Sequence, residues 1–153
     1  MIYNRTKNDV DESFVLLREK VQKFLALSED EMETLEKGTL TINTLNRIEE
    51  KQKELKDIIN DMGYWNTSIN NKTWNNSEIF YSKDLERIFK NAEILRNAFF
   101  VYKTTPEAPP ISYNFESFNA LEKILFDIDK MINDVKSRYK KCGKVRCGGI
   151  LNG

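Results

Sequence analysis

Residues 118–139, FNALEKILFDIDKMINDVKSRY, decide the fold class of this chain. Apolar residues recur in this stretch at alternating spacings of three and four, at Phe118, Leu121, Leu125, Ile128, Ile132, Val135 and Tyr139. That alternation keeps one apolar stripe on one side of an α-helix, where it packs against neighbouring helices. We therefore predict a long amphipathic helix that starts near Asn114 and ends at about Tyr139.

Two helices are predicted before residue 40. The first has Asn8 as its N-cap and acidic residues in its first turn. Ser28 opens the second, a short helix, because Glu31 stands three residues later and completes a capping box, and Gly38 ends it. The expected core stripe of the first helix is Val10, Phe14, Leu17, Val21 and Phe24.

A third helix follows Thr41 or Asn43 and stops at Gly63. Its stripe reads Leu45, Ile48, Gln52, Leu55, Ile59 and Met62. The polar member, Gln52, is expected at a solvent-exposed edge, and the alternative is that it fixes register or oligomeric state from within the seam.

The fourth helix is capped by Ser82 and ends before three closely spaced prolines, because proline cannot continue a helix. Its stripe is Leu85, Ile88, Ala92, Leu95, Phe99 and Tyr102. Together the segments predict an all-α fold, an antiparallel bundle of four long helices plus one short helix over residues 9–139. An N-terminal arm (1–8) and an extended basic C-terminal arm (140–153) flank it.

Residues 64–81 break the helical pattern and form an irregular aromatic loop or a small hairpin. Trp65 and Trp74 lie among several asparagines there. Tryptophan is enriched in interface hot spots, so these two side chains are candidates for a partner surface. The alternative is that the aromatic residues fold back and cover one end of the bundle.

The charge composition excludes a strong overall field. Among 153 residues, 24 Lys and Arg balance 24 Asp and Glu. No nucleic acid or anionic membrane is therefore expected as a charge-driven partner. The N-terminus lacks the apolar run of a signal peptide, and no segment approaches the roughly 18 apolar residues of a membrane span, so we expect synthesis in a cytoplasm.

Reactive side chains are few. The chain has no histidine, the commonest general base and metal ligand. Cys142 and Cys147 supply two thiolates where a structural zinc site needs four ligands. Glu49, Glu122 and Asp129 suggest carboxylates facing each other across a bundle, but the Glu-x-x-His motifs of di-iron proteins are missing. We predict no enzyme, no metal and no cofactor.

After Asp134 the sequence turns basic, with Lys136, Arg138, Lys140, Lys141, Lys144 and Arg146 and no acidic residue. A Cys-Gly pair repeats in this arm at a spacing of five. Such an arm has no core of its own, so it either orders on a partner or is a disordered end.

Several blocks together resemble a family of small structural proteins from the tail and baseplate regions of phages and prophages of Clostridium-like Gram-positive bacteria. The resemblance covers most of the chain and rests on YNRT (3–6), Asp9-Val10, LNRIE (45–49), Gly63-Tyr64, Trp74, DLERI (84–88), Tyr113 and NALEKIL (119–125). Relatives often end in a twice-repeated aromatic-Ser-Gly-Glu pattern. Basic residues replace it here, in Lys141-Cys142-Gly143 and Arg146-Cys147-Gly148.

The resemblance implies a virion structural protein, a tail, baseplate or tail-fibre adaptor that assembles symmetrically with other tail subunits. Its expected partner contacts are Ile2, Tyr3, Arg5, Lys141, Cys142, Val145, Arg146, Cys147 and Ile150, with Trp65 and Trp74 as a second surface. The competing interpretation is a free cytoplasmic phage-encoded regulator that binds a host factor. A nucleic-acid binder using the basic arm is disfavoured by the overall neutrality.

Overall fold

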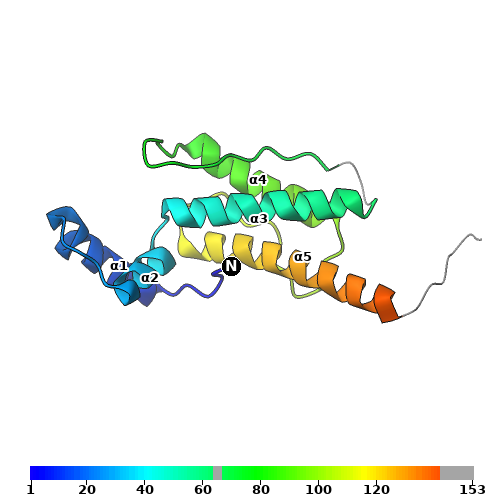
Figure 1. Ribbon diagram of the computed structural model, residues 1–153, viewed down its shortest axis with the longest axis horizontal. Coiled ribbons are helices and arrows are strands. Elements are labelled where there is room, and N and C mark those ends of the chain that lie inside the picture. Colours follow the sequence, from blue (N-terminus) through cyan, green and yellow to red (C-terminus); the bar gives the residue numbers. More distant parts are fainter. Residues whose placement is uncertain (64–66, 142–153) are drawn as a thin grey trace, which may run out of the picture.

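The computed structural model describes residues 1–63 and 67–141, and side chains only as far as residue 138. The regular structure of the described part is helical, with no strand, which confirms the all-α class. Figure 1 shows the elements, which are α1 (Lys7–Glu19), the short 3-10 helix η1 (Val21–Lys23), α2 (Glu29–Gly38), α3 (Ile42–Asp61), α4 (Ser82–Ala98) and α5 (Phe115–Lys141).

The predicted caps of α2 and α3 are confirmed, whereas the predicted cap of α4 is wrong, because Tyr81 is the N-cap and Ser82 is the first residue of the helix. Thr41 caps α3, and its hydroxyl accepts the Thr44 N–H at 3.1 Å. Ser28 and Glu31 form the predicted capping box of α2. At the start of α5 a side-chain oxygen of Asn114 accepts a backbone N–H at 2.8 Å. These caps are local, so a few residues of sequence suffice to predict them.

The cap of α1 was predicted wrongly. Thr6, not Asn8, is the N-cap, and its hydroxyl accepts the Asp9 N–H at 3.3 Å. The Asp9 carboxylate in turn accepts the Thr6 N–H at 2.6 Å. Asp9 stands three residues after Thr6 and so completes a capping box there.

The hydrophobic core is built by α3, α4 and α5. Phe89 and Phe118 meet edge to face in it, with ring centroids 5.4 Å apart. Helices α1 and α2 contribute no residue to this cluster, so the predicted bundle of four long helices is not confirmed. The buried core residues are Leu45, Ile48, Leu55, Ile59, Trp74, Leu85, Ile88, Phe89, Ala92, Leu95, Phe99, Phe118, Leu121, Ile124, Leu125, Ile128 and Ile132.

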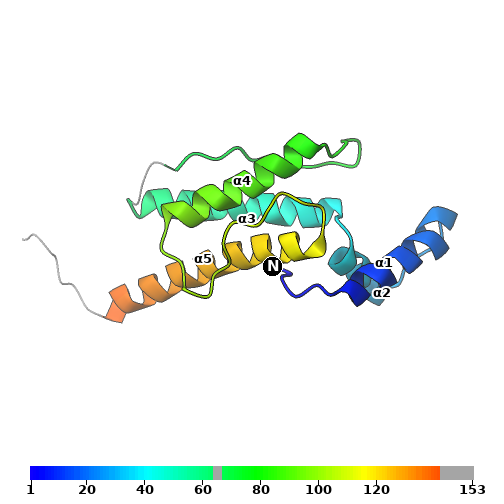
Figure 2. The same cartoon turned by 180° about the vertical axis from the view of Figure 1, so that it is seen from behind.

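The three core helices run in the same direction, as Figures 1 and 2 show. Arg87 pairs with Glu49, and further along both helices Asn91 hydrogen-bonds to Gln52. Helices α3 and α5 are parallel as well, because residue numbers increase along both helices from the ion pair Arg47–Glu122 to the ion pair Lys51–Asp129. The expected antiparallel arrangement is therefore wrong for these helices. The stripes could not reveal this, because a heptad stripe has the same spacing in either helix direction.

Two extended connections make the parallel order possible. Residues 67–74 return along α3, where Thr67 bonds to Asn60 and Trp74 bonds to Asn46. An extended chain advances about 3.3 Å per residue against about 1.5 Å in a helix, so residues 67–81 are long enough to run back along the whole of α3. Within 67–81 the chain has no strand, so it takes the irregular alternative rather than the hairpin.

The second return connection, residues 99–114, follows α5. Tyr102 donates a hydrogen bond to Asp134, and Thr105 donates one to Asp127 at 2.9 Å. Helix α4 ends at Ala98, so the predicted continuation of its stripe through Phe99 and Tyr102 is wrong. The chain leaves the helix at Phe99, which is buried in the core, and Tyr102 is then held by α5.

Gln52 is fully buried, so its expected position at a solvent-exposed edge is wrong. Its side-chain amide donates to the Ile88 carbonyl at 2.8 Å. The amide of Asn91 donates to its oxygen at 3.2 Å. Buried polar groups need such partners, and these partners fix α3 against α4.

Helices α1 and α2, with η1 between them, form a separate hairpin beside the first turn of α3 (Figures 1 and 2). We call residues 7–38 the lobe and residues 42–138 the body. Ser13 donates to the Thr34 carbonyl at 2.8 Å where the two helices meet. Gly38 is required at this contact, because a Cβ there would lie 1.8 Å from the Ser13 hydroxyl oxygen.

Candidate functional site

The apolar stripe of α1 is open to solvent. Its expected core role is wrong, because Ser13 is the buried residue of α1 and the stripe is not buried. Phe14 is 62% exposed, and Phe24, beyond the end of the helix, is 97% exposed. The helix turns its Ser13 side toward α2 and leaves the neighbouring apolar sector uncovered.

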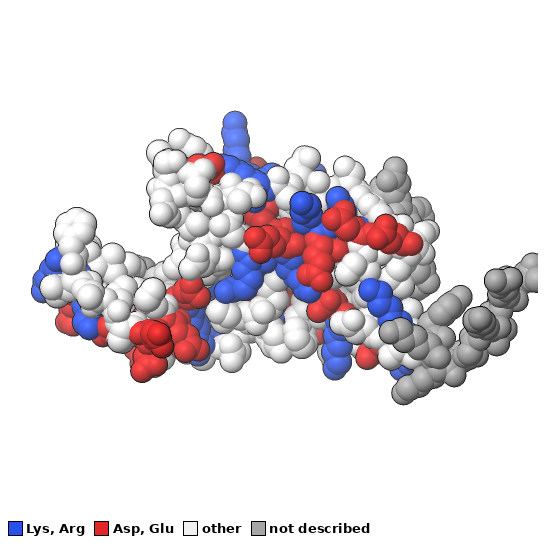
Figure 3. Space-filling view, viewed as in Figure 1, with Lys and Arg blue, Asp and Glu red and all other residues white. Residues whose placement is uncertain are grey.

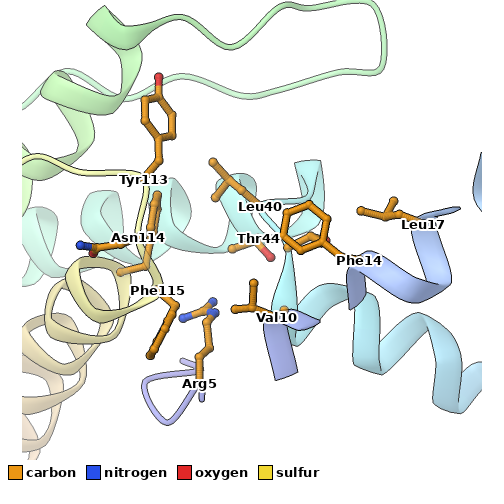
Figure 4. A pocket seen from close by; sticks show the side chains of 12 residues that line it. Arg5, Val10, Phe14, Leu17, Leu40, Thr44, Tyr113, Asn114 and Phe115 are labelled. Atoms are coloured by element: carbon orange, nitrogen blue, oxygen red, sulfur yellow. The ribbon is translucent and has the colours of Figure 1, made fainter. Parts of the chain in front are cut away.

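This stripe lines a groove of about 390 Å³ between α1 and the start of α5. Figure 4 shows Val10 and Phe14 on the α1 side, Leu40 and Thr44 at the α2–α3 junction, and Phe115 opposite them. We call the surface formed by Val10, Phe14, Leu17, Leu40, Tyr113 and Phe115 the α1 groove. Grooves lined by apolar side chains with a few polar groups are typical binding surfaces.

A second hollow extends the α1 groove along the helix. It measures about 560 Å³ and shares Phe14 and Leu17 with the first. Val15, 53% exposed, and Arg18 lie on its wall. The uncovered surface therefore runs along most of α1.

The tip of the lobe is apolar as well. Phe24 has a left-handed backbone with φ of 54°, a conformation that non-glycine residues seldom adopt. Leu25, the next residue in the sequence, and Met32 on α2 are each more than half exposed. Large exposed apolar patches and local backbone strain both occur preferentially at interaction sites.

Arg5 fastens the lobe to the body beneath the groove. Its side chain is 5% exposed, and its guanidinium lies 2.6 Å from a carboxylate oxygen of Glu122 on α5. The same guanidinium donates through Nε to the Lys37 carbonyl at the end of α2, at 2.9 Å. A buried charge needs such a partner, and here the pair joins three parts of the chain.

The predicted N-terminal contact residues are engaged within the chain. The Ile2 N–H donates to Glu122 at 2.6 Å, and the Tyr3 ring lies 5.0 Å from that of Phe126. Arg5 has the internal role just described. Their part in docking a neighbour stays a prediction.

Trp74 is 4% exposed and lies against α3. Its indole N–H donates to Glu49 at 3.3 Å, its ring lies 5.4 Å from that of Phe80, and the Lys72 ammonium stands 3.9 Å from the ring centroid. This placement favours the covering role over a partner surface. Of the other predicted contacts, Trp65, Cys142, Val145, Arg146, Cys147, Ile150 and the side chain of Lys141 lie outside the described residues.

The carboxylates that suggested a two-metal site form separate ion pairs. Glu49 accepts from both terminal nitrogens of Arg87, from Trp74 and from Asn71. Glu122 is paired with Arg5 and Arg47. Within residues 1–63 and 67–141, no group of three or more His, Cys, Asp or Glu side chains is arranged to hold a metal ion. Both carboxylates therefore act as structural anchors.

Sequence reasoning missed the far wall of the α1 groove. Leu40, Tyr113 and Phe115 fall outside the four heptad stripes, in the junctions that precede α3 and α5. Their one signal in the sequence is apolar character at positions where a turn would ordinarily be polar. Which junctions meet in space depends on the parallel helix order, and the stripes do not specify that order.

Two further findings bear on function. None of the helices in the described ranges is both long and apolar enough to cross a membrane. No protein-family model, no curated protein and no solved structure matches this chain.

Proposed function

We propose that this chain is a phage virion structural protein, an adaptor of the tail, baseplate or tail-fibre attachment that works through protein–protein contacts. The observation that carries the proposal is the uncovered apolar stripe of α1 beside a body that buries its own stripes. The resemblance of blocks such as YNRT (3–6) and NALEKIL (119–125) to tail proteins supplies the virion context.

The body suits a rigid spacer. Glu49 joins α3, α4 and the first return connection through Arg87 and Trp74, and it is 2% exposed. Glu122 joins α5 to α3 and to the N-terminal segment. Buried networks of ion pairs and hydrogen bonds rigidify a fold and hold its elements in one arrangement.

The proposed role includes no catalytic step. Glu49 and Glu122 are held in arginine pairs, and the sequence has no histidine to serve as a general base. On the face seen in Figure 3, basic and acidic side chains alternate over the body instead of forming a field of one sign. Protein neighbours are therefore the proposed partners, and the virion is the proposed location.

The test quantifies this chain against a known tail subunit in purified particles by mass spectrometry. A constant ratio in multiples of three or six is the expected result. Two matched variants then locate the contact. Phe14→Asp, in the α1 groove, should abolish incorporation, whereas Ile79→Asp, at a residue 65% exposed on the body, should leave it unchanged.

The terminal arms are the second proposed docking element. Deleting residues 140–153 should leave the circular dichroism and melting of the helical part unchanged and should abolish assembly into particles. Unchanged incorporation of this truncated chain would count against a docking role for the arm.

The alternative function, a free cytoplasmic regulator that binds a host factor, draws on the same α1 groove. It predicts that the chain is absent from purified particles and that Phe14→Asp abolishes binding to the host factor instead. Location in the particle thus separates the two functions.

A further inference from the structure

The α1 stripe has the spacing of a helix–helix seam. Val10, Phe14 and Leu17 are separated by four and three residues, as in a coiled-coil interface, and Val21 follows in η1, beyond the end of α1. Within the described residues no helix of the same chain covers this seam, since α2 packs on the Ser13 side. A helix is therefore the occupant that the spacing fits best.

The charges beside the seam are arranged in an ordered way. Asp11 and Arg18 are seven residues apart, which places them two turns from each other on the same edge of the stripe. Both are exposed, and neither forms an ion pair within the described part of the chain. Charged residues on the α2 side are used internally, in the pairs Asp9–Lys37 and Lys20–Glu31.

This pattern is self-complementary for two helices that run in opposite directions. Asp11 then faces Arg18 of the partner subunit, and the two-fold axis repeats the contact. In a parallel pair, the two-fold axis would place Asp11 of the two copies on opposite edges of the interface, so the contact between Asp11 and Arg18 would be lost. The apolar residues Phe14 and Leu17 lie between the two charged positions and would meet near the axis.

We propose that α1 of a second copy of this chain packs antiparallel on the α1 seam, about a two-fold axis between two lobes. The lobe projects beyond the body in both ribbon views (Figures 1 and 2). The inference rests on the proposed docking role of the lobe. It adds the identity of the neighbour, and it restricts the copy number expected in a particle to the even multiples of three.

The test uses two charge-reversed variants of the full chain, D11R and R18D. Each alone places like charges opposite each other twice across the axis, so each should be monomeric in analytical ultracentrifugation at concentrations where the wild type is a dimer. Mixed in equal amounts, D11R and R18D should form a heterodimer, since both contacts are then attractive. The double variant D11R/R18D should recover the homodimer.

E12R is the matched control. It makes the same change of charge in the same turn of α1, but Glu12 lies almost opposite the stripe at 3.6 residues per turn. E12R should dimerise like the wild type. Circular dichroism of every variant separates loss of association from loss of folding.

Two results would overturn the inference: a monomeric wild type at high concentration, or a mixture of D11R and R18D that stays monomeric while the wild type dimerises. Neither result touches the proposed virion role, which the particle measurement decides. Conversely, the chain could be absent from particles and still form the charge-dependent dimer. That result would refute the virion role and support the α1 pair.

Discussion

The lobe and the body carry similar apolar stripes and use them differently. In the body, the stripes of α3, α4 and α5 meet each other and bury residues such as Ile48, Leu95 and Leu121 completely. In the lobe, the stripe of α1 meets only the open α1 groove, with Phe14 62% exposed. Spacing therefore predicts which face of a helix is apolar, and tertiary structure decides whether the chain itself covers that face.

The same contrast holds for polar anchors. The body is tied internally by Glu49, which takes hydrogen bonds from α4 and from the first return connection. The lobe is tied to the body through Arg5, which bridges the Lys37 carbonyl and Glu122, and through Glu36, which accepts hydrogen bonds from Asn43 and Thr44. Ser13 and Leu35 are the two buried residues of the lobe, and regions with so little buried surface open at lower free energy.

The largest expected effect is in the body core. Leu125 is fully buried, so Leu125→Ala should lower the free energy of unfolding by about 3–4 kcal/mol through lost burial and a residual cavity. Urea denaturation followed by circular dichroism measures this. The matched change in the lobe, Leu17→Ala, should cost less than about 1 kcal/mol because Leu17 is only partly buried. Equal losses would erase the distinction between the two regions.

Next in size is the Glu49 anchor. Glu49→Ala leaves the Arg87 guanidinium and the Trp74 indole N–H without their acceptor, and we expect a loss of about 2–3 kcal/mol. Arg87 is 21% exposed and regains some hydration, which keeps the loss below that of a fully buried pair. As a control, Asp129→Ala removes a partner of Lys51 that is far more exposed than Glu49, 31% against 2%, and should cost under about 1 kcal/mol.

A smaller effect is expected where the lobe closes on itself. Gly38→Ala places a Cβ 2.2 Å from the Asp9 carbonyl oxygen, and we expect about 1–3 kcal/mol of local destabilisation as α2 moves from α1. Hydrogen exchange should rise in residues 7–38 and stay unchanged in the core helices. Gly63→Ala meets no neighbour but forces φ of 75° on alanine, so its exchange effect should be confined to the end of α3.

The smallest effect is a pH dependence of the lobe. The Lys37 ammonium, followed by Thr6, lowers the pKa of Asp9 from 3.8 to about 2. The folded pKa is below the unfolded one, so ionised Asp9 stabilises the lobe above pH 3.8 and this contribution disappears as the pH falls toward 2. Asp9→Asn should therefore raise hydrogen exchange in α1 at neutral pH and match the wild type near pH 2. A difference independent of pH would refute this assignment.

Much of the local structure is predictable because its causes are local. The caps formed by Ser28 with Glu31 and by Thr41 with Thr44 each join residues three positions apart. The stripes of α3 and α5 each lie within one helix. The direction of the helices is not predictable in that way. It depends on return connections such as 99–114, whose anchor Tyr102 contacts Asp134, far along the sequence.

The candidate site was predicted only in part, for the same reason. The sequence identifies the α1 stripe as apolar. It also led us to expect that the stripe packs in the bundle core, because the sequence does not show that Ser13 faces α2. Arg5 was predicted to contact a neighbouring subunit. Its partners within the chain, Glu122 and Lys37, are distant in the sequence, and only the fold brings them together. Leu40 and Phe115 had no periodic signal at all.

The most direct test of the account is the free energy of unfolding of Phe14→Asp in dilute solution, below the concentration at which copies associate. Dilution is needed because association would add its own stabilisation to the wild type. An open α1 seam predicts a change within about 0.5 kcal/mol, as for ordinary surface substitutions. A loss of several kcal/mol would show that Phe14 is a core residue and would contradict the division into a self-contained body and a docking lobe.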